Sequence, residues 1–279
     1  MDWLTRHKIP VGETAENAVD WLIANATGPF DALSALLGWL VAGILWTLQT
    51  PPPLLTVAVI VALTFALRRS WWLALALLLG LLFVINQGYW KETTETLTLV
   101  LASAIMCMAL GVPIGIWLAH RPRAFSFVRP VLDLMQTLPT FVYLIPAIVF
   151  FGLGMVPGLI ATIIFVLPAP IRLTQLGISS VPRPMVEAGQ AFGASRRQLL
   201  AKVELPAALP QIMAGLTQTI MLSLSMVVIA ALVGADGLGI PILRALNTLN
   251  IAQGFEAGIV IVVVAILLDR MLRLRDPAT

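Results

Sequence analysis

The chain has 279 residues, of which 59% are hydrophobic and only 11% are charged, and its formal net charge is +3. Soluble domains contain about 25% charged residues, and a soluble fold of this length could not keep so many apolar side chains away from water. The composition therefore excludes a soluble protein, while a single Cys (Cys107) and two His argue against an internal disulfide or a structural zinc site.

The N-terminal segment, residues 1–50, has a mixed composition. Its first 30 residues lack the continuous apolar stretch of a cleavable signal peptide, so insertion would depend on the spanning segments themselves. Residues 16–25 and 31–48 together favour an amphipathic helix on the membrane surface, before three prolines at 51–53. A spanning helix at 31–48 is the alternative.

The rest of the chain contains long apolar runs. A helix needs about 20 apolar residues to cross about 30 Å of hydrocarbon, and it pairs its own backbone groups in lipid. The sequence predicts an all-α polytopic membrane protein with seven transmembrane helices, or eight if 31–48 spans. Two peripheral helices lie in 51–89, a five-helix core in 90–271 and a tail in 272–279. The predicted spans are 52–67, 71–86, 97–119, 131–151, 157–176, 211–234 and 256–271.

The distribution of Lys and Arg predicts the orientation. With the N-terminus outside, only Arg6, Lys8, Lys91 and Arg244 lie outside, which leaves 13 of the 17 basic residues in cytoplasmic segments. Because basic residues favour the cytoplasmic side, we expect a multi-pass inner-membrane protein with its C-terminus in the cytoplasm. A span at 31–48 would move the N-terminus inside and leave the later orientation unchanged.

Several predicted spans contain Pro or small and polar residues. Pro residues kink or open helices, and small residues suit close helix–helix contact. Packing is the simpler interpretation, and a pathway lining that changes shape is the alternative. Asp133, near the start of one span, is expected to pair with Arg129 four residues earlier. The small and polar residues are Ser103, Gly111, Gly115, Gln136, Thr137, Gln218, Thr219, Ser223 and Ser225.

The longest cytoplasmic connection, residues 177–210, is predicted to hold two short helices. Residues 184–192 form the first, and Gly193 breaks it. Residues 195–204 form the second, with Ser195 as its N-cap, an apolar stripe at helical spacing and Pro206 as its stop. The loop is therefore expected to be two helices joined at a glycine elbow.

The order Glu187-Ala188-Gly189, Gly193 and Val203-Glu204-Leu205-Pro206 resembles the EAA loop of ABC importer permeases, with Gly189 and Val203 as departures from its usual Ala and Ile. We name residues 177–210 the coupling loop. Residues 129–145, 171–182 and 211–230 resemble the glycine betaine/proline betaine/choline permease family, a similarity that covers about residues 90–271.

This resemblance implies a type I (MetI-like) importer core and a permease homodimer. It also implies two cytoplasmic ATPase subunits, a separate substrate-binding protein outside, and import of choline, glycine betaine or proline betaine in osmoprotection. The chain has no Walker A pattern, so ATP and Mg²⁺ are expected on the ATPase. We expect a transport subunit in contact with lipid, without a cofactor, enzymatic activity or nucleic-acid partner of its own.

The coupling-loop residues are expected to form the contact with the ATPase. Gly193 permits the tight turn, and Glu187 offers a charge to a basic residue of the ATPase. A local pair between Glu187 and Arg183 is the alternative. The remaining positions, which keep the contact face thin or fix the return into the membrane, are Ala188, Gly189, Val203, Leu205 and Pro206.

Three further residues are candidates outside this loop. Tyr143 and Gln136 are candidates for the pathway because aromatic rings attract quaternary ammonium groups, although packing is the commoner function of an aromatic in a span. In the resembled family the aromatic cage belongs to the binding protein. Residues 234–250 are expected to form a short outer helix, or an ordinary loop, in which Arg244 could contact the binding protein.

Other functions stay open at this point. A permease of the same architecture could carry another solute, such as an amino acid. An ion-coupled secondary transporter would need carboxylates deep in the spans, where the predicted boundaries place none. An intramembrane hydrolase would need a Ser–His or paired-Asp arrangement, but His7 and His120 lie outside the predicted spans.

Overall fold

The computed structural model describes residues 11–272, and all of its regular structure in that range is helical. This confirms the all-α prediction, while predictions at Arg6, His7, Lys8 and 273–279 lie outside the described residues. In chain order the elements are α2 (Val11–Gln49), α3 (Pro53–Arg68), α4 (Trp71–Asn86), α5 (Trp90–Ala119), α6 (Pro122–Thr137), α7 (Thr140–Phe151), α8 (Met155–Val166), α9 (Pro168–Ser179), α10 (Arg183–Ala191), α11 (Arg196–Leu199), the π-helical turn η1 (Leu200–Glu204), α12 (Leu205–Ala231), α13 (Gly239–Thr248) and α14 (Ile251–Leu272).

The apolar runs form helices of unequal length. Within residues 11–272, the segments long and apolar enough to cross a membrane are Thr27–Gln49, Trp90–Ala119, Met155–Ser179, Arg196–Ala231 and Ile251–Met271. The predicted span 131–151 is broken: α6 and α7 meet at 93°, next to Pro139, and count as a sixth span only if taken together. The predicted spans in 51–89 form α3 and α4, whose 16 residues each fall short of the usual spanning length of about 20.

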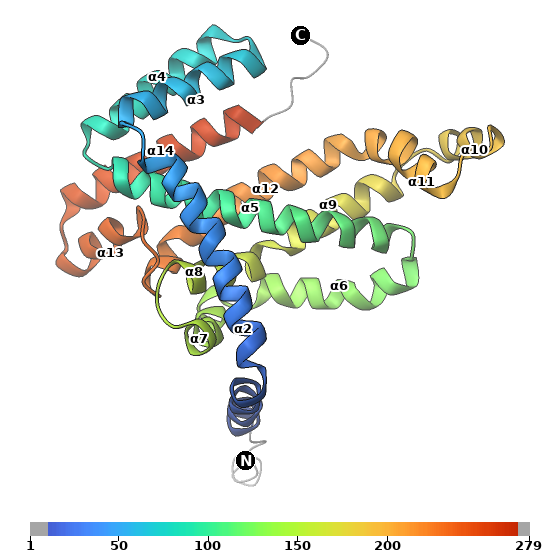
Figure 1. Cartoon of the computed structure of the whole chain (residues 1–279), viewed down its shortest axis with the longest axis horizontal. Helices are drawn as coiled ribbons and strands as arrows, with labels where there is room; N and C mark the ends of the chain where they lie inside the picture. The colour runs from blue at the N-terminus through green and yellow to red at the C-terminus, as the bar shows by residue number, and fades with distance from the viewer. Residues whose placement is uncertain (1–10, 273–279) are drawn as a thin grey trace, which may run out of the picture.

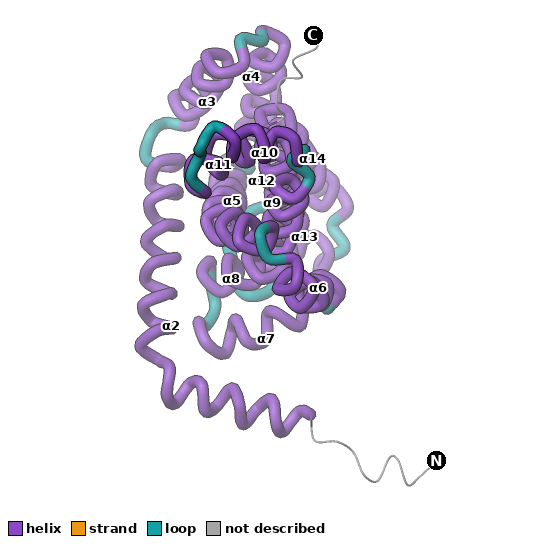
Figure 2. Tube along the Cα trace, turned by 90° about the vertical axis from the view of Figure 1, so that its right-hand side faces the viewer, coloured by secondary structure: helices purple, strands orange, loops and turns teal. Residues whose placement is uncertain are grey.

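The centre of the molecule is built from α5, α9 and α12, which run side by side in Figure 1 and are seen nearly end-on in Figure 2. Glycines bring α5 close to α9, since a Cβ on Gly115 would lie 2.7 Å from the Ile171 carbonyl oxygen. The buried hydroxyls of Ser103 and Ser223 join α5 to α12 at 2.7 Å. The packing interpretation is therefore confirmed for Ser103, Gly115 and Ser223, whereas Thr137, Gln218 and Ser225 are exposed.

Helix α2 lies across this centre rather than along it. It crosses α5 steeply in Figure 1, and Figure 2 shows it upright at the edge of the bundle. Leu37 and Val41 pack against α5 and α8, while Trp39 and Trp46 are exposed. Residues 27–49 have the length and composition of a span. The crosswise direction suits a surface helix, so the predicted surface position of 31–48 stays a prediction.

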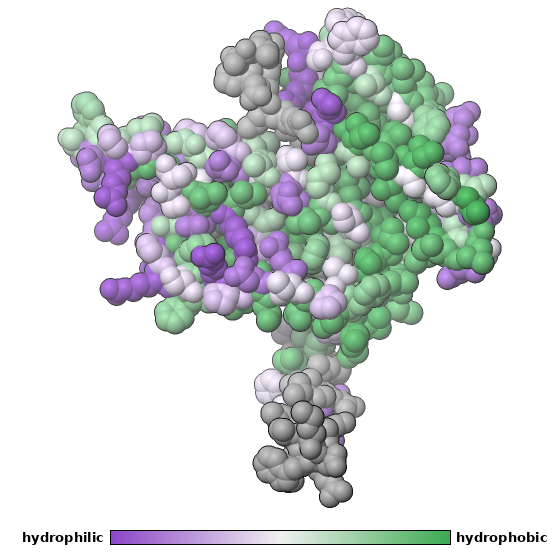
Figure 3. Space-filling model, turned by 180° about the vertical axis from the view of Figure 1, so that it is seen from behind, coloured by the Kyte–Doolittle hydropathy of each residue, from purple (hydrophilic) through white to green (hydrophobic). Residues whose placement is uncertain are grey.

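The outer surface is largely apolar. Figure 3 shows a broad hydrophobic area, with hydrophilic residues gathered at the left, at the end of the molecule that carries α10 and α11. Exposed large side chains on this surface include Leu67, Trp72, Phe127, Leu153 and Ile251. Such a surface is stable in contact with lipid tails, which confirms the prediction of a polytopic membrane protein.

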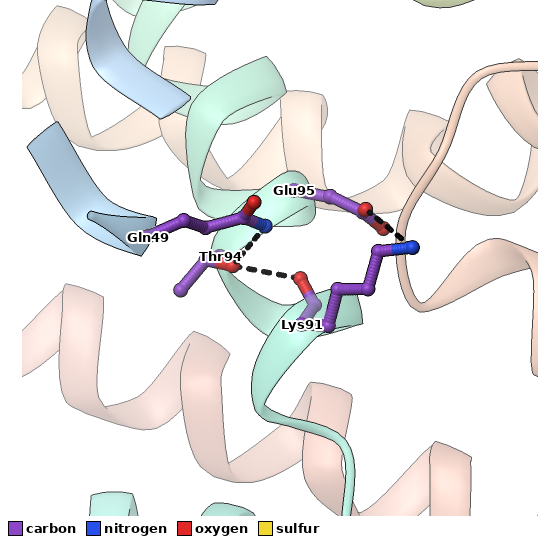
Figure 4. A network of polar contacts seen from close by, with 4 residues as sticks. All are labelled: Gln49, Lys91, Thr94 and Glu95. Atoms are coloured by element: carbon purple, nitrogen blue, oxygen red, sulfur yellow. Dashed lines mark hydrogen bonds and ion pairs between the residues drawn. The ribbon is translucent and has the colours of Figure 1, made fainter. Parts of the chain in front are cut away.

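A polar network joins the end of α2 to the first turns of α5 (Figure 4). Gln49 Nε2 donates to Thr94 Oγ1 at 2.9 Å, and Lys91 Nζ lies 3.7 Å from Glu95 Oε1. Glu95 is buried within the candidate span Trp90–Ala119, which begins seven residues before the predicted start at 97. The helix therefore extends further than the apolar run and carries a buried carboxylate in its second turn, which does not contradict the expectation that no carboxylate lies deep in the spans.

Candidate functional site: the coupling loop

The coupling loop forms the tip of the molecule. Helix α9 ends at Ser179, α10 and α11 follow as two short helices, and η1 leads directly into α12. Figure 1 shows α10 and α11 projecting at the far right, beyond the ends of α5 and α6. None of the residues of α10 is fully buried. The predicted pair of short helices is confirmed, and its first helix is available to a partner.

Gly193 makes the elbow between the two helices. Its φ is +77°, in the left-handed region that glycine adopts without a Cβ penalty. The Gly193 N–H donates to the Gln190 carbonyl at 2.8 Å, and the Ala194 N–H donates to the Gly189 carbonyl at 3.1 Å. These two bonds close α10 as a Schellman motif, in which glycine occupies the first position after the cap. The predicted glycine elbow is confirmed.

Ser195 begins the second helix immediately after the elbow. Its Oγ accepts from the Gln198 N–H at 3.4 Å, and Gln198 Oε1 accepts from the Ser195 N–H at 2.8 Å. This reciprocal capping box satisfies two backbone donors that the helix itself leaves unpaired. The predicted N-cap is confirmed, and the cap and the elbow together fix the angle between α10 and α11.

Gly189 lies where α10 approaches the second helix. A Cβ on Gly189 would lie 2.7 Å from Leu199 Cδ1 and 3.6 Å from Val203 Cγ2. Leu199 is buried and Val203 is half-buried, so the predicted apolar stripe faces α10. Gly189 therefore keeps the two short helices in close contact with each other, which differs from the expectation that it thins the face toward the ATPase.

The prediction that Pro206 ends the second helix is wrong. The helical path is continuous over Arg196–Ala231, with Pro206 in the first turn of α12. The preceding turn is π-helical, and the Leu205 N–H donates to the carbonyl of Leu200, five residues earlier. Proline clashes with the carbonyl four residues before it, and a π turn rearranges those carbonyls. Because of this turn, the coupling loop and the span α12 form one rod.

Glu204 is a residue of the site that the sequence did not single out. It occupies the variable position before Leu205, and its side chain is only 9% exposed. Glu204 Oε2 lies 2.9 Å from His120 Nε2, and the other ring nitrogen of His120 lies 2.9 Å from the Ile116 carbonyl oxygen. The pair therefore attaches the coupling loop to the end of α5. No local sequence signal indicates a contact between residues so far apart.

Helix α10 and its C-cap residue expose both charged and large apolar side chains. Glu187 and Ala188 are both exposed, and the ion pairs among residues 11–272 do not include the alternative pair of Glu187 with Arg183. Phe192, next to the elbow, is 91% exposed. A large aromatic ring exposed to water is typical of a surface that a protein partner covers. Phe192 was not among the site residues predicted from the sequence.

The positions of Tyr143 and Gln136 give less support to a pathway function. Tyr143 is 8% exposed, packs with Leu144 and Met226, and donates its hydroxyl to the Met135 carbonyl at 2.6 Å. It ties α7 to α6 across the 93° bend, which is a packing function. Gln136 on α6 is half-buried. A pathway function for these two residues stays a prediction.

The structure also shows the positions of the two charged candidates, Asp133 and Arg244. The expected pair of Asp133 with Arg129 is wrong, because Asp133 Oδ1 pairs with Arg172 Nη2 of α9 instead. The short helix predicted within 234–250 is present as α13, and Arg244 is exposed on it, while its outer position stays a prediction. Residues 11–272 contain no group of three or more His, Cys, Asp or Glu side chains placed to hold a metal ion.

Comparison with known proteins agrees with this geometry. Residues 111–279, more than half of the chain, match the family described as binding-protein-dependent transport system inner membrane component. The chain is 46% identical over 276 residues to the glycine betaine transport system permease protein OpuAB of Bacillus subtilis (strain 168), covering 97% of this chain and 95% of that protein. It is 43% identical over 264 residues to the glycine betaine/proline betaine transport system permease protein ProW of Escherichia coli (strain K12), covering 94% of this chain and 74% of that protein.

A solved structure shares the fold. The methionine ABC transporter MetNI, in an inward-facing conformation, contains a chain that matches with a TM-score of 0.58 and 23% identity over 64% of this chain and 92% of that one. The family resemblance seen in the coupling loop and the spans is confirmed. The chain belongs to the binding-protein-dependent transport system inner membrane components, and it has the fold of a type I ABC importer permease.

Proposed function

We propose that this permease imports quaternary ammonium compatible solutes, with glycine betaine and proline betaine as the first candidates and choline as a further one. The names of OpuAB and ProW, which align with almost the whole chain, support this substrate class. The observation that carries the transport function is the rod Arg196–Ala231, which connects an exposed coupling loop to a buried span without a break.

The proposed assembly is a homodimer of this permease with two ATPase subunits and one outer binding protein. The ATPase would hold α10 by its exposed face, where Glu187 and Phe192 lie. Closure of the two ATPases would move both coupling loops toward each other. Because α11, η1 and α12 are continuous and Glu204 is attached to His120, this movement would reach α12 and α5 together. The core would then change from inward-facing to outward-facing.

The proposed orientation follows from the same contact. The end with α10 and α11 would lie in the cytoplasm, and α13 with Arg244 would face the binding protein outside. The last span α14 then brings the C-terminus to the cytoplasm, in agreement with the distribution of basic residues. An N-terminus outside is proposed together with the surface position of α2. Single cysteines introduced at Gly88 and Phe192 in a Cys107→Ser background would test the two sides with a membrane-impermeant thiol reagent.

Uptake in reconstituted vesicles tests the function. The permease is combined with its ATPase and binding protein, and ATP-driven uptake of labelled glycine betaine, proline betaine, choline and methionine is compared. Gly193→Asp is expected to abolish uptake and leave membrane insertion intact. Gly88→Asp is the matched control, since Gly88 also has a φ of +77° and open space around it but lies outside the coupling loop.

Two results would overturn the proposal. Uptake of methionine but of none of the quaternary amines would change the substrate class and leave the coupling intact. Uptake by the permease alone, driven by an ion gradient, would instead indicate a secondary transporter. The buried Glu95 in α5 is the observation that would suit such a transporter, although its ion pair with Lys91 gives it a structural function.

A further inference from the structure

A cavity of about 560 Å³ lies between the α3–α4 turn and the end of α14. Figure 1 shows these two segments close together, on the side toward which α10 and α11 project. Three of the residues around the cavity are arginines, and none is a carboxylate. The residues that line it are Arg68, Arg69, Ser70, Trp71, Trp72, Leu73 and Arg270. We propose that this cavity binds the phosphate group of an anionic phospholipid.

The arginines come from distant parts of the chain and are held in place. Arg68 donates from Nε and Nη2 to the Met271 carbonyl, at 3.0 and 2.5 Å, which fastens the α3–α4 turn to the end of α14. This contact brings Arg270 of α14 beside the turn. Retention of positive charge on one side of the membrane accounts for arginines near that surface. It does not account for three of them around one cavity.

Arg69 occupies a backbone position that disfavours it. Its φ is +50°, and its N–H donates to the Phe65 carbonyl at 2.7 Å to close α3. This left-handed C-cap position is usually filled by Gly or Asn, because a larger side chain is strained there. Arg69 is exposed, so its side chain does not compensate for the strain by packing. A ligand that needs the guanidinium gives a reason for this residue.

The described ion pairs lie away from this cavity. The ion pairs among residues 11–272 are Lys91–Glu95, His120–Glu204 and Arg172–Asp133, and none of them includes an arginine of the cavity. The neighbouring carboxylate on α14, Asp269, does not line the cavity. Arginine binds phosphate through two parallel N–H···O bonds, so a phosphate is the anion that fits best.

The surroundings indicate a lipid rather than a soluble phosphate. Trp71 and Trp72 border the cavity and are 76% and 83% exposed. Exposed tryptophans are typical of the boundary between headgroups and acyl chains. Ser70 caps α4 by accepting from the Leu73 N–H at 3.5 Å, so the positive end of the α4 dipole also faces the cavity. In the orientation proposed above, this is the cytoplasmic leaflet, which carries anionic lipid.

Native mass spectrometry of the detergent-purified permease tests the inference without any transport assay. The protein is titrated with phosphatidylglycerol, with phosphatidylcholine, and with phosphatidylglycerol in the presence of inorganic phosphate. The variant Arg69→Gln/Arg270→Gln keeps Arg68 and its bonds to Met271. We expect it to bind phosphatidylglycerol roughly 25-fold more weakly, about fivefold for each arginine. Its phosphatidylcholine binding and its thermal unfolding in phosphatidylcholine should match those of the wild type.

The matched control is Arg123→Gln/Arg129→Gln, which removes two exposed arginines of α6 outside the cavity. We expect its phosphatidylglycerol binding to equal that of the wild type. Equal loss in both double variants would indicate a non-specific charge effect and overturn the inference, as would unchanged binding in the cavity variant. Displacement of phosphatidylglycerol by millimolar inorganic phosphate would assign the site to a soluble anion instead. Because the readout is binding, a failed uptake assay would leave this result unaffected.

Discussion

His120 and Glu204 are 84 residues apart in the chain, yet His120 Nε2 and Glu204 Oε2 lie 2.9 Å apart. The carboxylate belongs to the π-helical turn η1 of the coupling loop and is buried, whereas the imidazole follows the end of α5 and is half exposed. The pair gives the loop a second attachment to the core besides its continuity with α12. The coupling loop is therefore attached to two of the three central helices, α5 and α12.

The two partners of this pair should respond unequally to truncation. His120→Ala leaves a buried carboxylate without its partner, which costs about 1–3 kcal/mol. Glu204→Ala leaves a half-exposed imidazole that water can solvate, so its cost should be smaller. Thermal unfolding of the two variants and of the double variant gives the coupling energy between them. Equal effects of the two single variants would contradict the asymmetry, and additive effects would contradict a structural link. ATP-driven uptake should fall in the order of the measured destabilisation.

Substitutions at Gly193 should be ranked by their tolerance of a positive φ. The space around its missing Cβ is open, so backbone conformation alone decides the outcome. Alanine in the left-handed region costs about 1–2 kcal/mol, asparagine costs less, and a β-branched residue costs more. We expect uptake per ATP hydrolysed to decrease from Gly to Asn to Ala to Val. Gly43→Ala, in α2 with similarly open space, should leave this ratio unchanged.

Phe192 is expected to anchor the ATPase. It is 91% exposed at the tip of the coupling loop, so removing its ring should leave the folded permease as stable as before. An aromatic anchor in a protein interface contributes 2 kcal/mol or more, so Phe192→Ala should weaken ATPase binding by roughly 30-fold. Phe127→Ala is the control, because Phe127 is 82% exposed on α6 and outside the loop. Equal binding of the ATPase by both variants would contradict the anchor.

Features with local causes were predictable from the sequence. The elbow at Gly193 and the cap at Ser195 depend on the conformational preference and hydrogen bonding of single residues. The all-helical fold was also predictable, because a helix pairs its backbone groups within one apolar run. The family pattern located the coupling loop because its spacing reflects this local geometry.

Features that depend on the assembled fold were not predictable. The continuation through Pro206 requires a π turn, and the sequence has no signal for one. The partners of Asp133 and Glu204 come from other helices, so spacing along the chain suggested Arg129 for one and nothing for the other. The start of α5 lies before its apolar run, where Gln49 pairs with Thr94 and Lys91 pairs with Glu95.

The pair of Asp133 with Arg172 can be tested against the sequence-based alternative. The side chains are 51% and 32% exposed, so solvent weakens their attraction and the pair should contribute at most about 1 kcal/mol. Asp133→Asn and Arg172→Gln should each lower the melting temperature slightly, and the two losses should not add. Arg129→Gln should have no effect on its own. A loss at Arg129 that matches the loss at Asp133 would restore the pairing within α6.

Two glycines provide a matched comparison of what fills the space around them. A Cβ at Gly115 would lie 2.7 Å from the Ile171 carbonyl oxygen and 2.7 Å from Thr174 Cβ, whereas a Cβ at Gly189 would lie 2.7 Å from Leu199 Cδ1. The first obstacles are a backbone atom and a branch point, so α5 and α9 must move apart. The second is the end of a flexible side chain, which can rotate away. The distances alone therefore predict an equal loss of stability when each glycine is replaced by alanine. The nature of the neighbouring atoms predicts a larger loss at Gly115 than at Gly189.

We expect Gly115→Ala to destabilise the permease by about 1–3 kcal/mol, as overpacking of a close helix contact does. Gly189→Ala should cost less than about 1 kcal/mol, and it also restores the alanine that the family pattern has at this position. Both glycines lie in helices, so the gain in helix propensity is the same for both and cancels in the comparison. The melting temperature and membrane yield of the two variants measure the difference. Equal losses would mean that α5 can separate from α9 as easily as Leu199 rotates, and the core could not then transmit movement from the coupling loop as a rigid unit.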